Sequence, residues 1–220
     1  MHNKAIILNN ISKSYYQADK EISVLKNINF EVGEGEIVSI TGPSGSGKTT
    51  LLNIIALIDS LDLGKLNVFG EDLSNLSERE KSVFRKNNFG FVYQSNNLFE
   101  DFSAIENVAL PLILSGYKKN DAYNQSENIL SEFGLLDRKT HFPNALSGGE
   151  QQRVAIARAI VNKPRIVIAD EPTGNLDKDN SLIIFDYLMK YVDSEKLTVV
   201  MATHNNELAS KCNKEIKLAY

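Results

Sequence analysis

The sequence has a single cysteine, Cys212, among its 220 residues. One cysteine cannot form an internal disulfide, so we expect a reducing compartment and interpret Cys212 as a small side chain on the last helix. The sequence also lacks an excess of basic residues, because 24 Lys and Arg stand against 28 Asp and Glu, for a formal net charge of −4. Since this balance provides no basic field to attract nucleic acid, we expect no nucleic-acid partner.

Long apolar runs are missing as well. No segment reaches the roughly 18 consecutive apolar residues that a membrane-spanning helix needs. The run 108–114 contains Pro111, and the N-terminal run 5–8 is too short for the hydrophobic part of a signal peptide. We therefore expect a soluble chain without direct membrane insertion, which would reach a membrane only through a partner.

The sequence contains no internal repeat and no low-complexity tract, and with 42% hydrophobic residues it can bury a sizeable core. Short apolar runs alternate with helical patterns, and this alternation favours a mostly parallel sheet with helices on both faces. The fold class is therefore predicted to be α/β. The predicted strands are 5–8, 25–32, 36–41, 89–93, 166–169 and 198–202.

The middle of the chain differs, because residues 95–141 carry helical signals and few strand signals. A capping box is predicted at Ser103 and Glu106, and a similar one precedes this segment at Ser77 and Glu80. We interpret 95–141 as a helical subdomain inserted into a core formed by residues 1–94 and 142–220, within a single domain spanning 1–220.

A glycine-rich loop is the strongest chemical signal. Residues 42–50 match G-x-x-x-x-G-K-[ST] between the predicted strand 36–41 and a predicted helix 48–58. Backbone N–H groups of such a loop surround a β-phosphate, Lys48 can reach the β and γ oxygens, and the Thr49 hydroxyl can ligate Mg²⁺. The predicted ATP-binding residues of the loop are Gly42, Pro43, Ser44, Gly45, Ser46, Gly47, Lys48, Thr49 and Thr50.

A second glycine-rich helix start follows about a hundred residues later, and it comprises Ser147, Gly148, Gly149 and Glu150 after Leu146. Glycines there let the backbone approach a phosphate, and the following helix adds about half a positive charge at its N-terminus. Two anion-binding helix starts in one chain indicate two surfaces that converge on one nucleotide.

Polar residues follow three predicted strands. Asp170 and Glu171 end the strand 166–169, where Asp170 is expected near the Mg²⁺ shell and Glu171 beside an attacking water. Gln94 follows the strand 89–93, and its amide can contact both Mg²⁺ and water. His204 follows the strand 198–202 and can donate to the γ-phosphate.

The order of these motifs resembles that of the ATP-binding-cassette (ABC) ATPases, over nearly the whole chain. The matching motifs are Walker A at 42–50, the Q-loop Gln94, the signature 146–150, Walker B at 166–170 with Glu171, the D-loop 175–177 with Asp177, and the switch histidine His204. The resemblance implies a P-loop core with an N-terminal antiparallel β-subdomain. Tyr15 resembles the aromatic residue that stacks on adenine, with Tyr16 as the adjacent alternative.

The resemblance further implies a head-to-tail homodimer with ATP and Mg²⁺. Ser147, Gly148, Gly149 and Glu150 of one chain would close over the ATP that the other chain holds. It implies Glu171 as the general base, His204 as support for the γ-phosphate, and Thr49, Gln94 and Asp170 as metal ligands.

Two segments, 169–177 and 102–112, resemble one subgroup of this family. The subgroup comprises lipoprotein-releasing (LolD-type), cell-division (FtsE-type) and macrolide-export (MacB-type) ATPases, and the first is preferred because of residues 101–109. Residues 146–153 and 201–204 suit the cell-division type equally, whereas the macrolide type usually carries a fused membrane domain. The resemblance implies permease-like membrane subunits (LolC/LolE-like) and a peripheral location on the cytoplasmic side of the bacterial inner membrane.

Two departures from the family pattern stand out. Asn205 follows His204 where an aspartate is usual, and the chain stops at 217–220, short of the usual Asp-Gly hairpin. We therefore expect the final strand to lack its partner. A soluble ABC ATPase acting on nucleic acid or ribosomes is the competing class, but residues 49–146 show no sustained heptads and only one cassette is present. A GTPase is disfavoured because Asn-Lys-x-Asp is missing.

Overall fold

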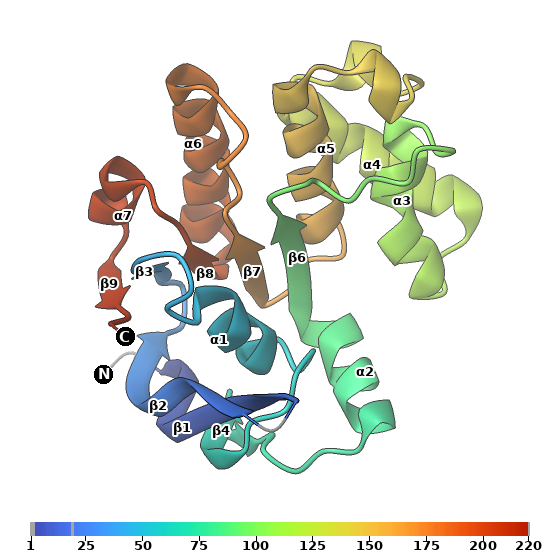
Figure 1. Ribbon diagram of the computed structural model, residues 1–220. Helices are drawn as coiled ribbons and strands as arrows, with labels where there is room; N and C mark the ends of the chain where they lie inside the picture. Colours follow the sequence, from blue (N-terminus) through green and yellow to red (C-terminus); the bar gives the residue numbers. More distant parts are fainter. Residues whose placement is uncertain (1–2, 19, 220) are drawn as a thin grey trace.

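The computed structural model describes residues 3–18 and 20–219, which form two sheets and several helices (Figure 1). The strands are β1 (Lys4–Gln17), β2 (Lys20–Gly33), β3 (Ile37–Thr41), β4 (Leu63–Val68), β5 (Glu71–Asp72), β6 (Phe89–Tyr93), β7 (Ile166–Asp170), β8 (Thr198–Ala202) and β9 (Lys214–Lys217). The helices are α1 (Lys48–Ile55), α2 (Glu78–Asn88), α3 (Ala104–Leu114), α4 (Lys119–Glu132), α5 (Gly148–Ile160), α6 (Lys178–Glu195) and α7 (Asn206–Lys211), with 3-10 turns at Leu136–Arg138 and Pro143–Ala145.

The central sheet has five parallel strands in the order β6-β7-β8-β3-β9. Every residue of β3 and β8 is buried, as expected for strands covered on both faces of a parallel sheet. The predicted α/β class is confirmed. Because all five strands run the same way, their carboxyl ends meet at a single edge of the sheet.

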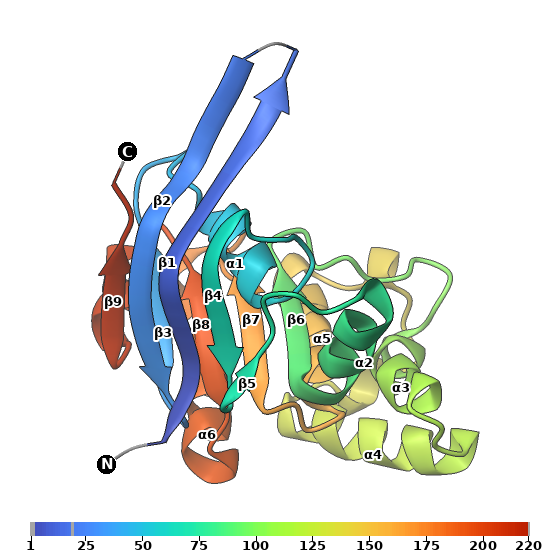
Figure 2. The ribbon, with the colours of Figure 1, turned by 90° about the horizontal axis from the view of Figure 1, so that it is seen from below.

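The N-terminal sheet is antiparallel, in the order β2-β1-β4-β5. Its first two strands are 14 residues each, far longer than the predicted 5–8 and 25–32. Figure 2 shows the tips of β1 and β2 extending beyond the rest of the molecule. Side chains there are mostly exposed, so cross-strand pairing rather than burial holds the tips, and hydrophobic pattern does not reveal them.

The final strand has a partner, so the sequence-based expectation that it lacks one is wrong. β9 pairs in parallel with β3, with Val38 opposite Lys214 and Thr41 opposite Lys217. The Thr41 hydroxyl donates to the Glu215 carboxylate at 2.7 Å. The chain leaves β8, turns through α7 and returns along the edge of β3.

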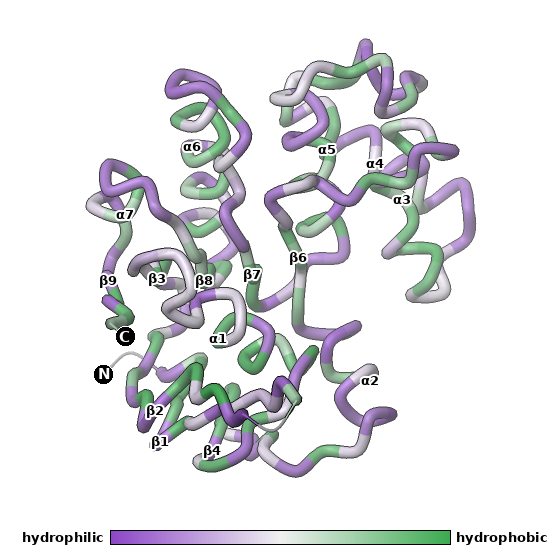
Figure 3. The backbone as a smooth tube through the Cα atoms, viewed as in Figure 1, coloured by the Kyte–Doolittle hydropathy of each residue, from purple (hydrophilic) through white to green (hydrophobic). Residues whose placement is uncertain are grey.

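Alternate residues of the central strands feed two apolar clusters on opposite faces of the sheet. Val167 packs with the cluster that includes α3 to α6, whereas Ile168 packs with α1 and the antiparallel sheet. Figure 3 shows hydrophobic residues along β7 and β8, where the two clusters meet the sheet. Both faces of the central sheet are therefore covered by apolar side chains, including both faces of β3, the strand that leads into the glycine-rich loop.

Helix boundaries follow local capping signals. Both predicted capping boxes are present, at Ser77 with Glu80 and at Ser103 with Glu106. Helix α1 ends at Ile55, before the predicted 58, because Leu57 adopts a left-handed φ of 58°. Residues 95–141 hold α3 and α4 and no strand, although the division into subdomains stays a prediction. None of the helices in the described ranges is both long and apolar enough to cross a bilayer.

Candidate functional site

Three of the parallel strands deliver predicted site residues to one cavity. The glycine-rich loop follows β3, Gln94 follows β6, and Asp170 and Glu171 end β7. These side chains and the loop line a cavity of about 360 Å³. A larger cavity of about 600 Å³ lies elsewhere, between α4 and α6, and none of these strand-end residues reaches it. The chemistry therefore points to the smaller cavity, since ligands of open α/β sheets bind at the carboxyl ends of the strands.

Glycines 42 and 47 are required by the backbone of the loop. Gly42 has a φ of 150°, and a Cβ there would lie 2.5 Å from the Leu218 carbonyl oxygen. Gly47 has a φ of 90°, and a Cβ there would lie 2.8 Å from the Leu25 side chain. Helix α1 begins directly after Gly47 and has no acidic residue in its first turn. The loop thus presents an uncompensated helix N-terminus to the cavity, an arrangement that favours anions.

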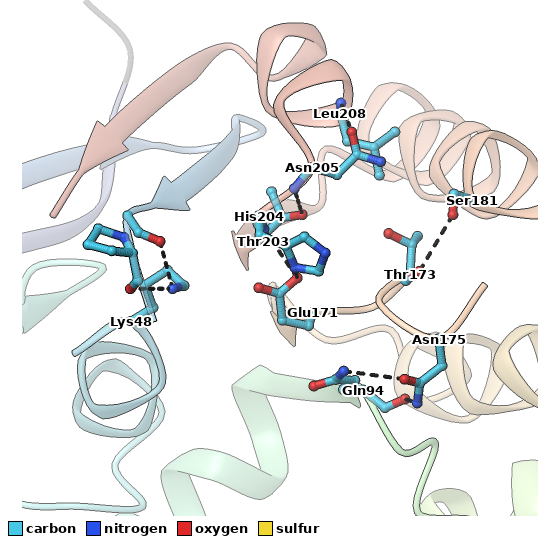
Figure 4. Close-up of polar contacts among 12 residues, drawn as sticks. Lys48, Gln94, Glu171, Thr173, Asn175, Ser181, Thr203, His204, Asn205 and Leu208 are labelled. Carbon is cyan, nitrogen blue, oxygen red and sulfur yellow. Dashed lines mark hydrogen bonds and ion pairs between the residues drawn. The ribbon is translucent and has the colours of Figure 1, made fainter. Parts of the chain in front are cut away.

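Lys48 is folded over the loop that precedes it. Its Nζ donates to the carbonyl oxygens of Gly42 at 2.9 Å and Pro43 at 3.0 Å (Figure 4). Because both acceptors are neutral, the ammonium charge has no anionic partner in these contacts. The ammonium group is therefore held at the cavity rim with its charge available to a phosphate.

Asp170 lies half-buried at the end of β7, where its carboxylate hydrogen-bonds the Thr49 side chain. Burial raises the pKa of Asp170 above its ordinary value, and the nearby Glu171 charge adds to the rise, while Thr49 and Lys48 oppose it. The hydroxyl and the carboxylate that were predicted as metal ligands are thus in contact with each other.

Glu171 and His204 come together from the ends of β7 and β8. The Glu171 Oε2 atom lies 2.8 Å from His204 Nδ1 and accepts the His204 backbone N–H at 3.2 Å (Figure 4). Glu171 adopts a left-handed φ of 47°, and its own N–H donates to the Ala202 carbonyl at 3.0 Å. Backbone strain at a non-glycine residue that carries chemistry is typical of functional sites.

Gln94 is paired with Asn175 by two hydrogen bonds. Gln94 Nε2 donates to Asn175 Oδ1 at 3.3 Å, and Asn175 Nδ2 donates to the Gln94 carbonyl at 2.9 Å (Figure 4). With its Nε2 committed to Asn175, the Gln94 amide has its oxygen left for a cation. This pairing could not be found from sequence, because the two residues are 81 positions apart and share no motif spacing.

Ser147 forms the N-cap of α5, in a capping box with Glu150. Ser147 N–H donates to Glu150 Oε2 at 2.8 Å, and Arg138 Nε donates to Glu150 Oε1 at 3.1 Å. These donors hold the pKa of Glu150 below its ordinary value, against the opposing effect of burial. Ser147, Gly148, Gly149 and Glu150 do not line the cavity of their own chain, and Figure 1 shows α5 grouped with α3 and α4.

The two tyrosines near the end of β1 point to opposite faces of the antiparallel sheet. Tyr15 is 40% exposed, and its hydroxyl donates to the carboxylate of Asp59, which follows α1. Tyr16 is 77% exposed. Only Tyr15 therefore lies toward the nucleotide loop, where the Thr50 side chain also hydrogen-bonds its phenol oxygen.

The remaining residues singled out in the sequence serve as helix caps. Asp177 is the N-cap of α6 and accepts the Asn180 N–H at 2.9 Å. Asn205 caps α7 by accepting the N–H groups of Glu207 and Leu208, a role that explains a short polar side chain after His204. Cys212 ends α7, where burial raises its thiol pKa to about 11, as suits an unreactive side chain.

Comparisons with known proteins agree with this arrangement. The family model described as ABC transporter matches residues 25–174. Lipoprotein-releasing system ATP-binding protein LolD 2 of Rhodopseudomonas palustris is 43% identical over 97% of this chain and 92% of its own length. LolD of Rickettsia bellii is 42% identical over 100% of this chain and 97% of its own.

Solved structures agree as well. A post-hydrolysis dimer of the ATP-binding cassette MJ0796 with ADP and Pi superposes with a TM-score of 0.90 at 39% identity, covering 97% of this chain and 94% of that one. A dimeric structure of MJ0796 described as a bacterial ABC transporter cassette gives a TM-score of 0.90 at 40% identity, with the same coverage.

Proposed function

This chain belongs to the ABC transporter family and hydrolyses ATP, and we propose that it drives the release of lipoproteins from the bacterial inner membrane. The observation that carries the proposal is the identity of 42–43% to lipoprotein-releasing ATPases, which extends over at least 97% of the chain. The cell-division and macrolide-export types share the same motifs and are the alternative outcomes of the test below.

Nucleotide binding starts from the glycine-rich loop. Its backbone N–H groups and the N-terminus of α1 would receive the phosphates, and the Lys48 ammonium would exchange the carbonyls of Gly42 and Pro43 for phosphate oxygens. The exchange is favourable because a charged acceptor replaces two neutral ones. Tyr15 would stack on the adenine.

Thr49, Asp170 and Gln94 fit Mg²⁺. They line one cavity and offer a hydroxyl, a carboxylate and an amide oxygen, which are the hard ligands that this ion prefers. When bound, Mg²⁺ would neutralise charge on the β- and γ-phosphates. The contact between Thr49 and Asp170 supports this assignment, since it holds two of the proposed metal ligands next to each other.

Hydrolysis needs a group that orients and deprotonates water, and we assign this role to Glu171. His204 holds the Glu171 carboxylate from one side through its Nδ1 and backbone N–H. The Glu171 side chain is 15% exposed whereas that of His204 is 67% exposed, so the imidazole is the partner with room to turn toward a γ-phosphate.

A second copy of the chain would complete the site. Ser147, Gly148, Gly149 and Glu150 lie outside the cavity of their own chain, and Ser147 heads a helix whose N-terminus favours anions. We propose that they contact the nucleotide of the partner copy in a homodimer, with Asp177 near the interface. The dimeric state of the MJ0796 cassette structures supports this arrangement.

The membrane partners proposed for the dimer are LolC/LolE-like subunits, which would give the chain a peripheral place on the cytoplasmic side of the inner membrane. The segment 95–105 supports this docking, because Phe99 and Phe102 are 51% and 37% exposed and their rings pack 5.5 Å apart. Exposed aromatic pairs of this kind are typical of binding surfaces.

The test is reconstitution with the LolC- and LolE-type proteins of the same organism in proteoliposomes loaded with a fluorescent lipoprotein. ATP should release the lipoprotein to a soluble carrier, and the Glu171→Gln variant should not. If these partners do not stimulate the ATPase activity and a cell-division or macrolide-export membrane protein does, the chain belongs to that type instead.

A further inference from the structure

The hydroxyl of Tyr15 is held at two points beside the nucleotide loop. It donates to Oδ2 of Asp59, and the Thr50 side chain hydrogen-bonds the same phenol oxygen. Thr50 lies in the first turn of α1, and Asp59 follows the C-terminus of that helix. The Tyr15 side chain of β1 is thus attached to the helix that begins with the nucleotide loop.

Both carboxylate oxygens of Asp59 have hydrogen-bond or ion-pair partners. Its Oδ1 accepts the Ser60 N–H at 2.7 Å and lies 3.2 Å from the Lys13 Nζ, while Oδ2 accepts the Tyr15 hydroxyl. Burial alone would raise the pKa of Asp59, but these donors outweigh it and hold the pKa below its ordinary value. The carboxylate is therefore ionised at neutral pH and forms a charge-assisted bond with the phenol.

Lys13 closes the cluster on the side of the ring. The side chain of Lys13 is 9% exposed, and its Nζ lies 3.3 Å from Asp62 and 5.2 Å from the centre of the Tyr15 ring. The ammonium thus binds both carboxylates and contacts the aromatic face. Asp62 touches Lys13 and the Ser14 N–H, and it has no hydrogen bond to Tyr15 among the described residues. This difference makes Asp62 a natural control for Asp59.

Tyr15 lies on the strand next to β2, which contributes a residue to the lining of the cavity. Tyr15 pairs with Ile22 across the hairpin, and Val24, two residues farther along β2, lines the cavity and approaches Gly47. The orientation of a tyrosine ring depends on two side-chain torsions, so fixing the hydroxyl end fixes the plane that the ring presents. Without that bond, the exposed ring would be free to turn.

We propose that Asp59 is a positioning residue for the nucleotide base: it holds the Tyr15 ring in the orientation that stacks on the base. This inference rests on the proposed stacking role of Tyr15. Base–aromatic stacking changes affinity by about tenfold or more per base, so a disordered ring should lose much of that factor. The phosphates are held by other groups and should not be affected.

The experiment compares two ligands by isothermal titration calorimetry, ATP and inorganic tripolyphosphate, which has no base. Tyr15→Phe removes only the hydroxyl, and Asp59→Ala removes its acceptor. Each should weaken ATP binding about three- to tenfold and change tripolyphosphate binding less than about twofold, and the double variant should be no weaker than the single ones. Asp62→Asn, which takes a charge partner from Lys13 but leaves the phenol bond, should bind both ligands like the wild type.

Each other outcome identifies what is wrong. Equal loss of ATP and tripolyphosphate binding in Asp59→Ala overturns the proposal, because the loop rather than the ring would be disturbed. Loss of ATP binding in Asp62→Asn also overturns it, since the Lys13 ion pairs would then be the cause. Tyr15→Ala distinguishes the stacking role of Tyr15 from the positioning role of Asp59. If this variant leaves the ratio of the ATP and tripolyphosphate affinities unchanged, the stacking role itself fails. If Tyr15→Ala lowers the ratio while Tyr15→Phe and Asp59→Ala do not, only the positioning role of Asp59 fails.

Discussion

The Nδ1 atom of His204 lies 2.8 Å from Oε2 of Glu171, and the His204 backbone N–H donates to the same oxygen at 3.2 Å. The two residues end neighbouring parallel strands, so the register of β7 with β8 sets their separation. A carboxylate that is held from one side keeps its other oxygen for water. This relationship supports two separate roles, in which Glu171 orients and deprotonates the attacking water and His204 contacts the γ-phosphate.

Replacing Glu171 by Gln should reduce ATP hydrolysis by about 10²–10⁴-fold, the usual contribution of a general base. The amide keeps an oxygen for the His204 N–H, so the fold and ATP binding should be retained. Phosphate release measures the rate, and sizing chromatography in saturating ATP should show a stable dimer. A variant that stays monomeric under those conditions would contradict the proposed dimer.

Ser147→Arg should keep ATP binding and lose both dimerisation and hydrolysis, because Ser147 lies outside its own cavity and a long side chain would block the partner surface. The substitution also removes the N-cap of α5, at a cost of about 1 kcal/mol. Ser147→Ala is the control, since it removes the same cap without the bulk. It should melt at a lower temperature yet still dimerise with ATP, and normal hydrolysis by Ser147→Arg would disprove the partner contact.

Asn175→Ala should raise the Mg²⁺ concentration needed for half-maximal ATPase activity by about two- to tenfold, which corresponds to one or two hydrogen bonds. The reason is orientation: Asn175 accepts from Gln94 Nε2 and so keeps the amide oxygen available to the cation. Asn175→Asp retains the acceptor and should show a smaller shift. An unchanged Mg²⁺ requirement in both variants would remove Gln94 from the proposed metal site.

The Glu150 carboxylate should stabilise the start of α5 only while it is ionised. Its folded pKa is depressed by the Ser147 N–H and by Arg138, so its contribution is present above the unfolded value and is lost as the pH falls through the folded value. Glu150→Gln mimics the protonated form. The melting temperature of the wild type should exceed that of the variant at neutral pH, and the difference should vanish in acid; a difference independent of pH would count against this account.

The strand-end residues of the site could be predicted from sequence because each follows a short buried strand. Gln94, Glu171 and His204 each follow a predicted strand and are singled out by the resemblance to the ABC ATPases, and the parallel arrangement of the strands then brings their elements to one edge. The glycine-rich loop is equally local. The geometry of the cavity therefore follows from neighbouring residues plus one rule about parallel sheets.

The contacts that refine the site could not be predicted in this way. Asn175 meets Gln94 and Asp59 meets Tyr15 across 81 and 44 positions of sequence, with no spacing that signals either pair. The pairing of β9 with β3 has no sequence signal either, because the residues of β9 are mostly polar and lie at the sheet edge, where burial leaves no pattern. Long-range polar contacts depend on how the chain packs, and hydrophobic periodicity carries no information about them.

The pairing of β9 with β3 makes the far end of the chain a wall of the nucleotide loop. The Leu218 N–H donates to the Thr41 carbonyl at 2.8 Å, and the Leu218 carbonyl lies where a side chain on Gly42 would have to go. Substitutions in β9 or at Leu218 should thus act on phosphate binding, although 170 or more residues separate the two segments. Protein engineering of the nucleotide affinity can accordingly begin at β9 and Leu218 and leave the glycine-rich motif intact.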